Sequence, residues 1–75
     1  MSKKKQMFTV IVERDTESGW YVGEVAELPG CYTQASDLPS LEVNIREAID
    51  AYLQETGKIT QASEFVGTLR IGVAA

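Results

Sequence analysis

The spacing of apolar residues changes once along this chain, and that change constrains the fold more than any other feature of the sequence. Residues 7–14 alternate and are rich in β-branched side chains, which predicts a strand. One side of that strand carries Phe8, Val10 and Val12. After Leu38 the apolar positions follow i, i+4, i+7 and i+8, which predicts one helix with a single apolar stripe. The stripe consists of Leu41, Ile45, Ala48, Ile49, Tyr52 and Leu53.

Two turn signals divide the strand-forming part of the chain. Residues 15–19 combine turn-forming side chains with a terminal Gly19, which predicts a hairpin whose returning strand covers residues 20–27. Pro29 removes a backbone donor and Gly30 permits a positive φ, so a turn or bulge is expected there. Strand formers resume over residues 31–35. We therefore expect an antiparallel meander of three strands over residues 7–35.

The helix has recognisable start and stop signals. Ser36 or Asp37 is the natural N-cap, and Pro39 falls in the first turn, where its missing N–H costs nothing. Gly57 occupies the position at which helices commonly stop. The outer face of the helix is expected to be solvated, since it carries charged side chains at successive i+4 spacings: Glu42, Arg46 and Asp50.

A further alternation near the end of the chain predicts a fourth strand over residues 65–73. Leu69, Ile71 and Val73 share one face, with Thr68 and Arg70 on the other. The predicted order is βββαβ, an α+β fold with an antiparallel sheet and one helix packed on one face. We expect a single domain over residues 7–75, after a disordered basic N-terminus over residues 1–6. One helix covers only one face of a sheet, so we expect a homo-oligomer, a dimer or a tetramer.

Charge and composition exclude several classes of protein. The chain has 75 residues, with 7 basic against 11 acidic side chains and a formal net charge of −4, which opposes general binding to DNA or RNA. The basic cluster Lys3-Lys4-Lys5 is interpreted as a solubilising tail. Apolar runs are too short for an export signal or a membrane span. The unpaired Cys31 suits a reducing compartment, so we expect a cytoplasmic protein.

The sequence offers no recognisable catalytic centre. There is no histidine to act as a base for Cys31, which we interpret as an ordinary strand residue. Among the carboxylates, Glu13 and Glu47 do not converge with enough others for a two-metal nuclease, and the last predicted strand offers only Arg70. We therefore expect no enzymatic activity, no cofactor and no metal.

Two segments resemble the HicB-like antitoxin family. The first is Glu27-Leu28-Pro29-Gly30-Cys31 followed by T-Q-A, and the second is the N-x-x-E-A-x-x-x-Y-L helix from Asn44 to Leu53. The similarity covers roughly residues 8–55. It implies a βββαβ domain similar to a reduced ribonuclease-H core without the catalytic centre. It also implies a partner, a HicA-like toxin, which is a small basic ribonuclease that cleaves mRNA with a catalytic histidine.

The sequence departs from that family in two places. Longer members continue into a DNA-binding domain, whereas this chain stops at Ala75, so we expect no direct DNA binding. The family's helix usually begins like Thr followed by Glu-Glu-Ala, but here Asp37-Leu38-Pro39-Ser40-Leu41 stands in that stretch. The cap is retained in Asp37, and the first-turn glutamate is absent.

The resemblance and the acidic charge together predict an antitoxin-like protein that neutralises a basic toxin. The residues expected to bind the partner are the aromatic and acidic side chains of the hairpin and the Pro-Gly loop, with one leucine: Trp20, Tyr21, Glu24, Glu27, Leu28 and Tyr32. Each of the aromatic residues is also compatible with ordinary packing in a sheet. The alternative function is a stand-alone oligomeric scaffold or small-ligand-binding protein without a toxin partner.

Overall fold

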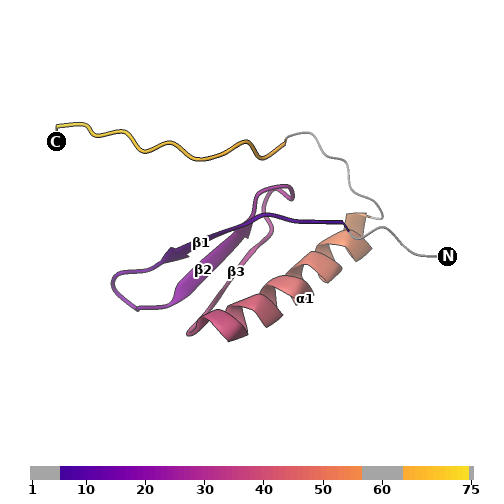
Figure 1. Cartoon of the computed structure of the whole chain (residues 1–75). Coiled ribbons are helices and arrows are strands. Elements are labelled where there is room, and N and C mark those ends of the chain that lie inside the picture. Colours follow the sequence, from indigo (N-terminus) through magenta and orange to yellow (C-terminus); the bar gives the residue numbers. More distant parts are fainter. Residues whose placement is uncertain (1–5, 57–63, 75) are drawn as a thin grey trace.

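The computed structural model describes residues 6–56 and 64–74. It has three antiparallel strands, β1 (Val10–Arg14), β2 (Tyr21–Val25) and β3 (Tyr32–Ala35), in the order β1-β2-β3, followed by one helix, α1 (Leu38–Thr56) (Figure 1). The α+β fold and the meander are therefore confirmed. The expectations for residues 1–5, for Gly57 and for most of the connection after α1 lie outside the described residues.

The β1–β2 hairpin forms where the turn residues predicted it. Gly19 has φ 79°, a left-handed conformation that glycine adopts without steric cost. Its N–H donates to the carbonyl of Asp15 at 2.8 Å, and the Asp15 carboxylate accepts from the Ser18 hydroxyl at 2.8 Å. That hydrogen bond, with a second from the N–H of Glu17, lowers the pKa of Asp15. The loop is thus held by its own side chains.

The β2–β3 connection is a pair of tight turns. Leu28 N–H donates to the Val25 carbonyl at 3.2 Å, and Cys31 N–H donates to the Leu28 carbonyl at 3.0 Å. In the second turn Pro29 and Gly30 are the central residues, and Gly30 has φ 82°. Proline followed by a glycine at positive φ is the pattern of a type II turn. The bulge or turn predicted from Pro29 and Gly30 is confirmed as a turn.

Helix α1 begins with the cap that its sequence predicted. The Asp37 carboxylate accepts a hydrogen bond from the N–H of Ser40 at 2.8 Å, and this bond lowers the pKa of Asp37. The apolar stripe of α1 faces the sheet: Leu41 and Ile45 are buried, and the other four members pack against them. Glu42 and Arg46 form an exposed ion pair at 3.1 Å on the outer face.

The core lies between α1 and one face of the sheet. The buried cluster consists of Val25, Leu28, Cys31, Ala35, Leu41 and Ile45. Gly23, at the centre of β2, also faces α1, because a Cβ at this position would lie 3.1 Å from Cδ1 of Ile45. The helix packs against β3 and β2 and leaves β1 at the margin. Alternation alone did not show which face of each strand is buried. The position of α1 decides this, because the face that packs against the helix is the buried one.

The predicted fourth strand is wrong for this chain on its own. Residues 64–74 are extended but lie outside the sheet, and they run clear of the other elements (Figure 1). We call this segment the C-terminal arm. Four of its aliphatic side chains, Val66, Leu69, Ile71 and Val73, are 91%, 89%, 78% and 79% exposed. The alternation predicts strand character correctly, but a strand requires a hydrogen-bonded neighbour, which local sequence does not supply.

Candidate partner-binding face

The face of the sheet opposite α1 is not covered by any described element. It presents alternate residues of all three strands, which come together in a shallow hollow of about 430 Å³. We call it the open face, and its residues are Ile11, Glu13, Val22, Glu24 and Tyr32. The antiparallel register sets this grouping, because Glu24 lies opposite Ile11 on one side and opposite Tyr32 on the other. Two carboxylates thus border three apolar or aromatic side chains.

Two of the predicted partner-binding residues belong to the open face. Glu24 is exposed in the middle of β2. Tyr32 begins β3 and is 66% exposed, beside Ile11 and Val22. An exposed tyrosine offers an apolar ring and a hydroxyl with little rotamer entropy to lose, which suits a binding residue.

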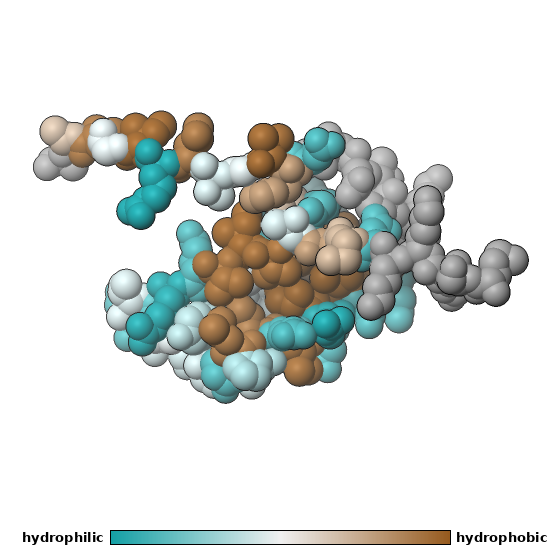
Figure 2. Space-filling view, viewed as in Figure 1, coloured by the Kyte–Doolittle hydropathy of each residue, from teal (hydrophilic) through white to brown (hydrophobic). Residues whose placement is uncertain are grey.

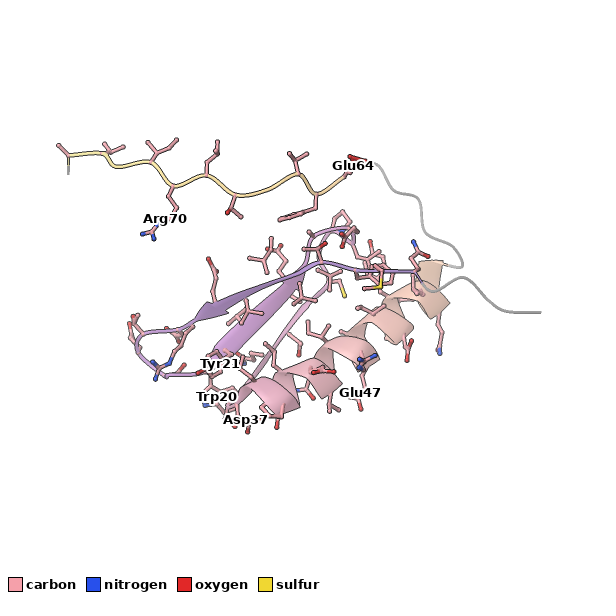
Figure 3. All side chains as sticks on the ribbon, in the orientation of Figure 1. Trp20, Tyr21, Asp37, Glu47, Glu64 and Arg70 are labelled. Atoms are coloured by element: carbon pink, nitrogen blue, oxygen red, sulfur yellow. The ribbon has the colours of Figure 1, made fainter. Side chains whose placement is uncertain are left out.

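The other two predicted aromatic residues lie elsewhere. Trp20 directly precedes β2 and remains exposed at the hairpin end of the sheet (Figure 3). Tyr21 points to the helix side, where it packs against the core cluster and lies 6.0 Å from the guanidinium carbon of Arg14. Tyr21 is therefore mainly a packing residue, whereas Trp20 is available at an edge of the molecule.

Glu27 and Leu28 have structural positions in the β2–β3 connection. The N–H of Thr9 donates a hydrogen bond to the Glu27 carboxylate at 2.7 Å. Partial burial would raise the pKa of Glu27, but the hydrogen bonds from Thr9 outweigh burial, so the pKa is lowered. This bond ties the start of the first hairpin to the Pro-Gly loop. Leu28 is 2% exposed in the core, so its side chain is not accessible to a partner in this conformation.

The residues considered for catalysis are also dispersed. Cys31 is buried in the core, and burial raises the pKa of its thiol, which disfavours the reactive thiolate. Glu47 lies on the exposed side of α1 (Figure 3), on the other side of the helix from the sheet. Within residues 6–56 and 64–74, no three histidine, cysteine or carboxylate side chains gather in a way that would hold a metal ion.

Sequence reasoning missed three members of the open face: Ile11, Glu13 and Val22. Their alternation with buried neighbours was visible, because Ile11 and Glu13 fall on the opposite side of the first strand from Val10. What was missing was the register between strands and the choice of face. Both depend on where α1 packs.

In the part of the chain that the structure describes, no helix combines the length and the apolar character required to cross a bilayer. No family model matches the sequence, and no solved structure matches it.

Comparison with curated proteins does find relatives that share most of their length with this chain. A UPF0150 protein of Synechocystis is 44% identical over 69 residues, covering 92% of this chain and 97% of its own. A UPF0150 protein of Archaeoglobus fulgidus is 45% identical and covers 80% of this chain and 84% of its own. A UPF0150 protein of Thermotoga maritima is 36% identical and covers 97% of each.

Proposed function

Since the chain belongs to the UPF0150 family, a family name that specifies no activity, we propose a function from its surface: it is a HicB-like antitoxin that binds and neutralises a small basic HicA-like toxin. The single observation that carries the proposal is the open face. Exposed carboxylates there border an exposed tyrosine and two aliphatic side chains on the sheet.

Charge supports a basic partner. The chain has a formal net charge of −4, and the open face contributes Glu13 and Glu24 to it. Complementary charge accelerates encounter and disfavours acidic competitors, but most affinity in protein complexes comes from buried aromatic and aliphatic contacts. Tyr32, with Ile11 and Val22 beside it, supplies such contacts. In this proposal the sheet covers the toxin's surface sterically and contributes no chemistry.

The test is co-expression with the product of the neighbouring small basic open reading frame. We expect the two proteins to co-purify and the chain to restore the growth that this product inhibits. Tyr32→Ala removes the exposed ring and is expected to weaken binding by at least tenfold, and Glu24→Lys reverses one charge and is expected to slow association.

Matched controls come from the outer face of α1. Val43→Ala shortens an exposed apolar residue there, and Glu47→Lys makes the same charge reversal as Glu24→Lys. We expect both controls to bind as the unmodified chain does. The proposal is refuted if the neighbouring product neither co-purifies nor inhibits growth, or if the α1 variants weaken binding as much as the open-face variants.

A second candidate function is a stand-alone oligomeric scaffold or small-ligand-binding protein. The exposed aliphatic side chains of the C-terminal arm favour this candidate, because they indicate self-assembly that requires no toxin. Gene neighbourhood separates the two candidates, since an antitoxin is expected beside the gene of its toxin.

A further inference from the structure

The C-terminal arm has the side-chain pattern of an inward-facing strand without a sheet to join. Leu69, Ile71 and Val73 lie on one side of the extended chain, and all three are more than three-quarters exposed. The opposite side carries Thr68 and Arg70. Alternation of this kind is typical of a strand with one buried face, yet here the apolar side contacts solvent.

The first complementary feature is the free edge of β1. The carbonyl of Thr9 and the N–H of Asp15 both bond to the β2 side of the hairpin at 2.8 Å. In an antiparallel ladder the backbone N–H and C=O groups of every second residue point toward the same neighbouring strand. Since those of the odd-numbered residues of β1 point toward β2, the backbone groups of Val10 and Val12 point to the outer edge. Among the described elements no strand lies along that edge. β1 contains no proline, which would prevent a further strand from pairing.

The second complementary feature is an apolar groove beside that edge. Because α1 packs over β3 and β2, it leaves a groove of about 270 Å³ between itself and β1. We call this the β1–α1 groove. The apolar side chains lining it are Val10 and Val12 from β1, and Leu38, Leu41 and Ile45 from α1. Val12 and Leu38 are about half exposed there. In Figure 2 apolar atoms gather at the centre of the view and again along the arm.

We propose that the C-terminal arm of one copy adds to the β1 edge of a second copy, with Leu69, Ile71 and Val73 filling the β1–α1 groove. Backbone hydrogen bonds to β1 would supply affinity, and the alternate side chains would supply fit. Arg70 would then lie on the same side of the sheet as Glu13, which places opposite charges together. Two copies exchanging arms form a closed two-fold dimer in which each groove is covered.

The occupant is a second copy because the chain leaves its own groove uncovered. In Figure 1 the arm runs above the sheet without joining it, and the molecule is 53 Å long but only 27 and 22 Å across. A chain of this size also has a small core for which association is a common supplement. The proposal does not require the toxin, so it stands or falls independently of the proposed function.

The first test uses full-length chains and light scattering. The unmodified chain is expected to have twice the mass of one chain at micromolar concentration. Leu69→Lys/Ile71→Lys places two charges on the groove-facing side of the arm and is expected to abolish the dimer. Thr68→Lys/Gly72→Lys adds the same charge on the other side, where Glu13 offers the opposite charge, and is expected to retain it. A monomeric unmodified chain, or equal dimerisation of both variants, overturns the proposal.

The second test identifies the pairing directly and does not depend on the folding of charged variants. A tagged chain with Val12→Cys is mixed with an untagged chain carrying Leu69→Cys, Ile71→Cys or Val73→Cys, and the mixture is oxidised. At least one pair is expected to form an interchain disulfide, whereas Arg70→Cys, on the opposite side of the arm, is not. Cys31 remains in place because it is buried. Exchange is overturned if no mixed pair forms an interchain disulfide, or if a chain that carries both Val12→Cys and one of the arm cysteines forms the disulfide only within itself, because the arm then folds back.

Discussion

Gly23 offers a sensitive check on how closely α1 packs against the sheet. A Cβ at this position would lie 3.1 Å from Cδ1 of Ile45 and 3.2 Å from Cγ1 of Val10, both closer than ordinary van der Waals contact. Its φ is not positive, so alanine would cause no backbone strain. The effect of Gly23→Ala therefore depends on two opposing terms, packing in the folded state and chain entropy in the unfolded state.

The packing term is the larger one. Forcing an extra methyl group into a well-packed core costs about 1–3 kcal/mol. Replacing a glycine in a compatible conformation gains about 0.4–1 kcal/mol, because the unfolded chain loses freedom. We expect Gly23→Ala to lower the free energy of unfolding by a net amount of up to about 2.6 kcal/mol. With a urea m-value of about 1 kcal/mol/M, the unfolding midpoint would fall by up to about 2.6 M.

The measurement is urea unfolding followed by circular dichroism, with all variants at one protein concentration because association contributes to stability. Gly72→Ala is the matched control, since nothing lies within 4 Å of a Cβ at that position. Ile45→Val removes Cδ1, the nearest atom, and is expected to cost less in the Gly23→Ala chain than in the unmodified chain. Stabilisation by Gly23→Ala, or strict additivity of the two substitutions, would refute the packing argument.

Further predictions concern the core, the Pro-Gly turn and acid stability. Leu28→Ala is expected to lower the free energy of unfolding by about 2–5 kcal/mol, as measured by urea unfolding, because it leaves a cavity in the core; a loss below 1 kcal/mol would contradict the buried position. Gly30→Ala is expected to cost about 1–2 kcal/mol, since alanine would have to adopt the φ of 82°, and a melting temperature equal to that of the unmodified chain would argue against this turn. Folding lowers the pKa values of Asp37 and Glu27 from their ordinary values of 3.8 and 4.5. The stabilisation from these two carboxylates is therefore complete above those ordinary values, and it is lost as the pH falls through the lower pKa values of the folded state. Asp37→Asn keeps a capping side chain without titrating, so its melting temperature should fall less on acidification than that of the unmodified chain; an identical pH profile would remove Asp37 from the explanation.

Local rules were sufficient for the elements whose stability is local. The cap at Asp37, the hairpin turn that ends at Gly19 and the turn at Pro29 and Gly30 each act over a few residues, so they could be identified without knowing the fold. The apolar stripe of α1 was equally visible, because helical spacing determines which side chains share a face. Each of these predictions is confirmed.

The candidate site was only partly visible in the sequence. Glu24 and Tyr32 were identified as surface residues and do lie on the open face, whereas Leu28 is in the core. The signal that led to Leu28 was its place beside Pro29 and Gly30, and a turn at the surface does not prevent the side chain before it from pointing inward. Ile11 was missed because it joins Tyr32 only through the register of β2 with both neighbours.

Where the chain turns, where the helix starts and which side chains alternate together could be predicted from local sequence, because those properties depend on neighbours within a few residues. Contacts between distant segments determine which set of alternating side chains is buried, how closely α1 approaches Gly23, and that residues 64–74 remain unpaired within one chain. These outcomes depend on contacts between segments far apart in sequence. An alternating pattern specifies a strand with two faces, and the position of α1 selects the face that is buried.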